Sequence, residues 1–166
     1  KSCNIVASCE GKGKTFIMFS DDLDKALATF VLANGAAATG QKVTIFFTFW
    51  GLNVIKKLHK PNVEKDIFGK MFGMMLPSSS RKLKLSKMSM GGIGGKMMRY
   101  IMNRKGIDSL ESLRQQALEN GVEFIACQMS MDVMGVKQEE LLDEVTIGGV
   151  ATYMERADNA NINLFI

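Results

Sequence analysis

The chain of 166 residues is 46% hydrophobic and 23% charged, as expected for a soluble globular protein with one domain and a substantial core. Its three cysteines do not suggest a disulfide framework, so a reducing, cytoplasmic compartment is expected. The single histidine, His59, argues against most His-based zinc sites and against a Ser-His-Asp hydrolase. No apolar run reaches the roughly 18 residues needed to span a bilayer, and no signal peptide is recognised.

The positive charge is concentrated in one part of the sequence. Between Lys56 and Lys105 there are 13 Lys and Arg residues and only two acidic residues, Glu64 and Asp66. The whole chain has 21 basic and 17 acidic residues, so the remainder has 8 basic and 15 acidic residues. The basic character therefore belongs to one segment and not to the whole fold.

The first half of the chain predicts two buried strands separated by a helix. Residues 1–14 are expected to form a partly flexible leader. Residues 15–20 (TFIMFS) and 42–50 (KVTIFFTFW) are apolar at successive positions, which is typical of strands buried on both faces. The intervening helix is predicted to begin at the carboxylates of Asp21 and Asp22 and to end at Gly40. Residues 51–58 (GLNVIKKL) are expected to begin another helix.

Residues 60–106 interrupt this pattern. They contain both prolines, an SSS run, GGIGG and eight of the 13 methionines, and we interpret them as a long insertion with helices at 68–76 and 95–106. A helix over 109–121 and a strand over 122–126 follow. A short polar helix is expected at 137–144, a fourth strand at 145–147, a helix at 148–160 and a last strand at 162–166.

Strands that alternate with helices predict a three-layer α/β/α sandwich with a mainly parallel five-stranded sheet, a flavodoxin-like architecture. Residues 15–166 would form this single domain, with the insertion at about 60–106. In such sheets ligands bind beyond the carboxyl ends of the strands. The turns after the first four strands contain Asp21, Trp50, Cys127 with Gln128, and Gly148 with Gly149. If the sheet is parallel, these turns share one edge.

Cys127 has two interpretations. Free cysteine is often a small buried hydrophobic residue. However, Cys127 ends a strand, and residues 130–132 (SMD) could start a short helix behind it. Backbone N–H groups that point at a thiol favour the thiolate, which is the nucleophilic form. Cys3 and Cys9 lie in the predicted leader with a spacing typical of neither metal sites nor redox motifs, and are interpreted as incidental.

Two glycine-rich stretches do not form nucleotide motifs. Residues 10–15 (EGKGKT) end like a phosphate-binding loop, but Ser8 stands where the first glycine is required and the stretch precedes a strand. GGIGG at 91–95 follows no good strand and is interpreted as a joint or a loose anion nest. The methionine-rich basic segment is interpreted first as an adaptable contact surface, either a lid over the thiol or a subunit interface. Alternatively it could lie on an acidic membrane surface or bind Cu(I). Nucleic acid is disfavoured because only Phe68, Phe72 and Tyr100 could stack.

Two longer stretches resemble the DsrE/DsrF-like sulfur-relay family. These are IMFSDDLDKALATFVLANGAAATGQKVTIFFTFWGLN at 17–53 and IACQMSMDVMGVKQEELLDEVTIGGVATYMERADNANINLFI at 125–166. They are most similar to the peroxiredoxin-labelled branch that carries a Met/Gly-rich insertion. The resemblance extends from about Thr15 to Ile166, and the combination of FFTFWGLN with CQMSMDVMG is its most specific part. The peroxiredoxin label itself is not supported, because no P-x-x-x-T-x-x-C arrangement precedes Cys127.

The resemblance implies a homo-oligomer and a cysteine, here Cys127, that holds sulfur as a persulfide or thiosulfonate. Sulfur donor and acceptor proteins or small persulfides would be its partners, and no cofactor or metal is expected. Asp21, Trp50 and Gln128 would line the pocket, and backbone donors at Cys127–Met129 and Gly148–Gly149 would stabilise the anion. The sequence fits both a carrier and a sulfurtransferase that turns over. Two alternatives remain: an adaptor that uses the methionine-rich segment, and, less favoured, a flavodoxin-like nucleotide binder.

Overall fold

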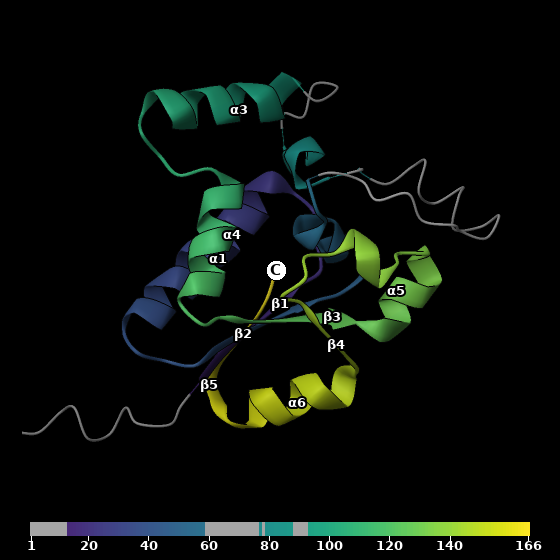
Figure 1. Cartoon of the computed structure of the whole chain (residues 1–166). Helices are drawn as coiled ribbons and strands as arrows, with labels where there is room; N and C mark the ends of the chain where they lie inside the picture. The colour runs from purple at the N-terminus through teal and green to yellow at the C-terminus, as the bar shows by residue number, and fades with distance from the viewer. Residues whose placement is uncertain (1–12, 59–76, 78, 88–92) are drawn as a thin grey trace, which may run out of the picture.

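The computed structural model describes residues 13–58, 77, 79–87 and 93–166 (Figure 1). Five strands form one sheet in the order β4-β3-β2-β1-β5, and each neighbouring pair is parallel. This confirms the predicted α/β fold and its parallel sheet. The strands are β1 (Gly13–Met18), β2 (Val43–Phe47), β3 (Glu123–Cys127), β4 (Thr146–Gly148) and β5 (Ala160–Phe165).

Helices cover both faces of the sheet (Figure 1). On one face α1 packs against α4, on the opposite face α6 contacts β1, β4 and β5, and α3 lies over the α1–α4 layer. No helix in the described ranges is long and apolar enough to cross a membrane. The α-helices are α1 (Leu23–Ala38), α3 (Ile93–Arg104), α4 (Leu110–Glu119), α5 (Gln128–Met134) and α6 (Val150–Asp158), and the 3-10 helices are η2 (Phe49–Ile55), η3 (Ser80–Lys82) and η5 (Gln138–Glu140).

Successive side chains of the central strands enter two different cores, because side chains of a strand alternate between the faces of a sheet. Ile45 and Phe47 of β2 belong to the larger core beneath α1 and α4. Phe46, between them, belongs to a smaller cluster with Ile125, Cys127 and Tyr153 of α6. Burial on both faces explains why these strands are apolar at consecutive positions.

The structure corrects several predicted boundaries. β1 begins at Gly13, so only residues 1–12 of the expected leader lie outside the described residues. β2 ends at Phe47 and not at Trp50, because Phe49 has a left-handed backbone (φ 48°) that turns the chain out of the sheet. The helix expected to begin within residues 51–58 is a 3-10 helix over residues 49–55, so it starts and ends earlier than predicted.

The region after β2 also differs in part from the prediction. The helix expected at 95–106 is α3, whereas the one expected at 68–76 lies outside the described residues. The helix expected at 109–121 is α4, and the Ser109 hydroxyl caps it by accepting a hydrogen bond from the Ser112 amide (3.1 Å). The polar helix expected at 137–144 is limited to the single turn of η5, because Leu141 leaves it to pair with Lys56 in an antiparallel bridge.

Polar contacts hold α6 against the sheet beside the smaller cluster. Arg156 of α6 donates through Nε to Glu123 Oε2 at the start of β3 (2.9 Å), and Thr44 of β2 donates to the same oxygen (2.9 Å). The Tyr153 ring lies 5.2 Å from that of Phe46. The hydrogen bond from Arg156 lowers the pKa of Glu123 below its ordinary value, and the bond from Thr44 acts in the same direction.

Gly51 is required where η2 crosses the end of β1. Its N–H donates to Phe19 O (2.8 Å), and a Cβ atom there would lie 1.9 Å from Met18 O. We expect Gly51→Ala to lower the free energy of unfolding by at least about 2 kcal/mol, because backbone must move. Gly35→Ala, in α1 with nothing within 4 Å of the added Cβ, is the control and should raise it by up to about 1 kcal/mol. Urea unfolding measures both, and equal effects would contradict the close approach.

The lowered pKa of Glu123 makes stability depend on pH. The contribution of the Glu123 carboxylate is fully present above its unfolded pKa of about 4.5, and is lost as pH falls through the lower folded value. We therefore expect Glu123→Gln to be less stable than the parent protein at pH 7 and the two unfolding curves to converge in acid. The effect should be small, because both partners are about a third exposed (38% and 34%). Glu155→Gln, which changes an exposed partner of the same arginine, should show no such convergence.

Candidate functional site

The carboxyl ends of strands β1 to β4 lie at one edge of the sheet. The register pairs Met18 with Phe47, Phe47 with Ala126, and Cys127 with Gly148. The turns after β1, β2, β3 and β4 therefore follow positions that are side by side, as the sequence predicted for a parallel sheet. This edge is where α/β folds bind their ligands.

Cys127 is both the last residue of β3 and the N-cap of α5. Its residue is 2% exposed, and it belongs to the small cluster beneath α6 with Phe46, Ile125 and Tyr153. The short helix expected to start at residues 130–132 is present, but it starts earlier, at Gln128, and extends to Met134. The burial of Cys127 fits a packing residue, whereas its place at the start of a helix brings unpaired backbone N–H groups to it. The structure therefore places Cys127 at the start of a helix, with its side chain enclosed in an apolar cluster.

Two glycines form the neighbouring part of the edge. Gly148 ends β4 opposite Cys127, and Gly149 is the N-cap of α6 without a side-chain cap. A Cβ atom at Gly148 would lie 2.9 Å from Ile125 Cγ2, so glycine allows β4 to approach β3 closely. The starts of α5 and α6 are therefore adjacent to Cys127 and Gly148, and both helix N-termini favour negative charge.

The side chains of Gln128 and Trp50 have other surroundings. The Gln128 amide is exposed and donates to Asp132 on the same helix (3.0 Å). Trp50 lies in η2 and is 44% exposed. Trp50 follows β2, the strand next to β3, so it belongs to the same edge as Cys127 although its ring is open to solvent.

Asp21 lies farther along the same edge. It follows β1, and β2 separates β1 from β3, so strand spacing places it on the order of 10 Å from the end of β3. Asn53 is fully buried and donates from Nδ2 to Asp21 Oδ2 (3.0 Å). Burial raises the pKa of Asp21 above its ordinary value. No described residue donates a hydrogen bond to Asn53 Oδ1.

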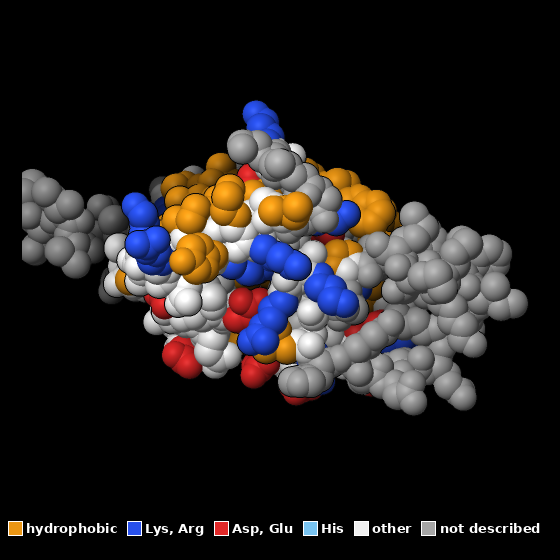
Figure 2. Space-filling model, turned by 90° about the horizontal axis from the view of Figure 1, so that it is seen from above, with side chains coloured by type: hydrophobic (Ala, Val, Ile, Leu, Met, Phe, Trp, Pro, Cys, Tyr) orange, Lys and Arg blue, Asp and Glu red, His pale blue; other side chains and the backbone are white. Residues whose placement is uncertain are grey.

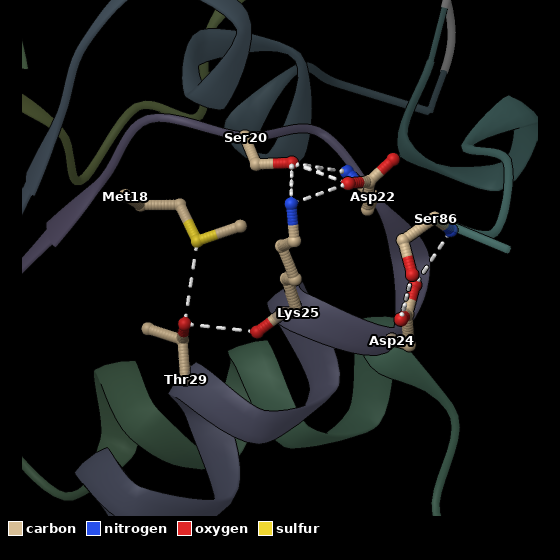
Figure 3. A network of polar contacts seen from close by, with 7 residues as sticks. All are labelled: Met18, Ser20, Asp22, Asp24, Lys25, Thr29 and Ser86. Atoms are coloured by element: carbon tan, nitrogen blue, oxygen red, sulfur yellow. Dashed lines mark hydrogen bonds and ion pairs between the residues drawn. The ribbon is translucent and has the colours of Figure 1, made fainter. Parts of the chain in front are cut away.

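The turn after β1 continues into a polar network at the start of α1 (Figure 3). Ser20 Oγ donates to Asp22 Oδ2 (2.8 Å), and Lys25 Nζ lies 2.8 Å from the same oxygen. Asp24 accepts from the amide of Ser86 (3.0 Å) and from its hydroxyl, so a segment far along the chain is attached to α1. This turn presents carboxylates, which disfavours a phosphate group and with it the nucleotide-binding alternative.

Sequence reasoning missed three residues near the candidate site. The hydroxyls of Thr48, after β2, and Ser130, in α5, are buried and lie 2.8 Å apart, which fastens α5 to the edge. Ser130 lies three residues after Cys127, in the first turn of α5, and residues at this spacing are neighbours on one side of a helix. Tyr153 covers the Cys127 side of the sheet, and its hydroxyl lies 3.3 Å from Thr15 Oγ1. The aromatic residue four positions after Gly149 was the available signal.

Comparisons with known proteins agree on the family. The sequence pattern of the DsrE/DsrF/DrsH-like family matches residues 11–165. An uncharacterized protein of Bacillus subtilis (strain 168), YrkE, is 44% identical over 155 residues, with 93% of this chain and 97% of that protein covered. The sulfur carrier protein DsrE2 of Allochromatium vinosum is 38% identical over 161 residues, which cover 95% and 99% of the two chains.

A solved structure supports the fold alone. The crystal structure of the ychN protein from E. coli matches with a TM-score of 0.55 and 9% identity, covering 93% of this chain and 99% of that one. The fold, the position of Cys127 at the ligand edge, and the match over nearly all of the sequence agree with one another. The chain belongs to the DsrE/DsrF/DrsH-like family, whose relatives include a sulfur carrier protein.

Proposed function

We propose that this protein is a sulfur carrier that holds sulfane sulfur on Cys127. The observation that carries the proposal is the position of Cys127: it begins α5, and it pairs in the sheet with Gly148, the residue before the N-cap of α6. Membership of a family with a sulfur carrier protein supports the same role. The adjacent starts of α5 and α6 support a mechanism with a single reacting sulfur atom and no second catalytic side chain.

Sulfur would enter by displacement at a sulfane sulfur. The Cys127 thiolate attacks the outer sulfur of a persulfide, R–S–SH, and the new S–S bond forms as the old S–S bond breaks. The bonding electron pair leaves on R–S⁻, and the terminal proton stays on the transferred sulfur, so the products are the Cys127 persulfide and a thiolate. An acceptor thiolate then repeats the step in the opposite direction.

Backbone dipoles supply the stabilisation in this proposal. Negative charge moves from Cys127 to the leaving thiolate and back, and the N-termini of α5 and α6, which begin next to Cys127 and Gly148, would stabilise it. Gly148 and Gly149 carry no side chains that would occupy this space. Asp21, Trp50 and Gln128 are proposed to line the wider edge at which a donor or an acceptor chain docks.

The burial of Cys127 implies a carrier with a closed resting state. The residue is 2% exposed beneath α6, so a stored persulfide is shielded from water and from unrelated thiols. Transfer then requires α6 or α5 to move when a partner docks. Donor and acceptor proteins or small persulfides would be the partners, and we infer a cytoplasmic homo-oligomer. Exposed apolar side chains of the edge strand β5, Ile162, Leu164 and Phe165, support self-association.

The carrier proposal is tested by measuring whether sulfur is added to Cys127. Treatment with a polysulfide should add the mass of one or more sulfur atoms to the intact protein, and Cys127→Ser should lose the addition. The double variant Cys3→Ser/Cys9→Ser keeps the proposed thiol and is the matched control. Intact-mass spectrometry before and after a reductant such as dithiothreitol measures the reversible part. Equal reversible loading of Cys127→Ser and the parent protein would rule the proposal out.

The two glycines give a graded test of the site. Gly148→Ala places a Cβ 2.9 Å from Ile125 Cγ2 and 3.4 Å from the Thr152 side chain, and should slow sulfur loading by crowding the Cys127 edge. Gly149→Ala has nothing within 4 Å and should cost less than about 1 kcal/mol of stability as a weaker N-cap. Loading rates with polysulfide, at matched folded fractions, distinguish the two. Loading slowed only by Gly149→Ala would contradict the assigned geometry.

A further inference from the structure

Helix α3 has two apolar sides. One packs on the domain through Gly94, Gly95 and Met102, which are buried. The other is exposed: Ile93 is 64%, Met97 51%, Tyr100 64% and Ile101 41% exposed. These four residues, hereafter the outer face of α3, follow the i, i+4, i+7, i+8 spacing of one helix side. Burial of the first side leaves the second without a partner among the described residues.

Hydrogen bonds attach α3, which carries the outer face, to the rest of the domain. Arg99 of α3 donates to Ser80 O (3.2 Å) and Leu83 O (3.4 Å), and Leu83 is 2% exposed. The segment 79–87 is in turn attached to the domain. Ser80 Oγ donates to Glu111 of α4 (3.0 Å), and the amide of Leu23 in α1 donates to Lys84 O (2.7 Å). The exposed stripe is thus held at a defined place on the α1–α4 layer.

The segments around the outer face have an excess of basic residues, and the carboxylates that border them, Asp24 and Glu111, are hydrogen-bonded to Ser86 and Ser80. Residues 79–87 and 93–107 contain no Asp or Glu, and seven of their basic residues are exposed. None of the seven forms an ion pair with a described carboxylate. Figure 2 views the molecule from the side of α3 and shows hydrophobic patches beside Lys and Arg, with acidic side chains both next to the central cations and toward the lower margin. The seven are Arg81, Lys82, Lys84, Lys87, Lys96, Arg104 and Lys105.

We propose that the outer face of α3 docks on the surface of an anionic lipid bilayer. A helix with an apolar stripe bordered by Lys and Arg inserts that stripe at the headgroup boundary while its cations meet the lipid phosphates. Each basic residue near such a surface strengthens binding about fivefold. The dock would orient the whole domain, because α3 is fastened to it, and is independent of the proposed sulfur chemistry.

Charge favours an anionic bilayer over a second copy of the chain as the partner of the outer face. Two outer faces brought together would oppose seven exposed cations with seven more, none of them ion-paired with a described carboxylate, and like charges across an interface are unfavourable. An acidic protein would satisfy the cations, so it is the remaining alternative. An acidic surface alone gives no reason for four exposed apolar side chains, whereas a bilayer accommodates both features.

The experiment uses the full chain and vesicles. Co-sedimentation with phosphatidylcholine vesicles that contain phosphatidylserine should show binding that weakens with salt, and pure phosphatidylcholine should bind at least tenfold less. Met97→Ser/Tyr100→Ser should weaken binding to the anionic vesicles at least tenfold without changing the unfolding midpoint. Val31→Ser/Leu32→Ser is the matched control, because both residues are exposed (57% and 47%) in a stretch of α1 without cations, and it should leave binding unchanged.

Three results would overturn the dock. The first is no binding to anionic vesicles, or equal binding to neutral ones. The second is a loss of self-association in Met97→Ser/Tyr100→Ser, by sedimentation velocity, with vesicle binding unchanged, which would make the face an interface between copies. The third is vesicle binding indifferent to Met97 and Tyr100 while soluble polyglutamate competes fully, which would indicate an acidic protein partner.

Discussion

The parallel pairing of β3 with β2 and β4 determines the candidate site. Because Cys127 is held opposite Gly148 in that register, the sulfur lies at the end of the sheet where two helices start. A shift of one residue would turn Cys127 to the other face, into the large core beneath α1 and α4. The rest of the site follows from this constraint. β4 approaches β3 closely through Gly148, and α6 covers Cys127. α5 is attached to the edge through the contact between Thr48 and Ser130.

Much of the fold could be predicted because its signals are local. Apolar runs bounded by Gly, Asp and Ser identify the buried strands, and the strand–helix alternation implies a parallel sheet. The end of β2 could not be predicted. Residues 48–50 continue the aromatic pattern of the strand, and only the left-handed backbone of Phe49 and the close contact of Gly51 with Met18 O end it. Both are tertiary effects, since they depend on β1 lying alongside.

The candidate site was predictable in position but not in detail. The place of Cys127 at a strand end follows from the sequence. Its burial under Tyr153 does not, because the order of strands in the sheet decides which helix covers it. Asp21 and Trp50 share the edge as the pattern indicates. The buried partner of Asp21, Asn53, lies in a 3-10 helix whose contact with the turn after β1 the sequence does not reveal. The double-sided nature of α3 was hidden for a related reason, since periodicity reports apolar positions and not which of them are covered.

The connection between the last two strands has a mechanical consequence. β4 and β5 are the opposite edges of the sheet, and α6 is the link between them. At about 1.5 Å per residue its nine residues span about 14 Å, less than the roughly 19 Å between the two edge strands, so the link has little slack. Withdrawal of α6 from above Cys127 must therefore pull on Gly148 at one edge, on Ala160 at the other, or on both. Access to the thiol is coupled to the edges of the sheet, and whatever braces those edges sets how readily the sulfur is reached.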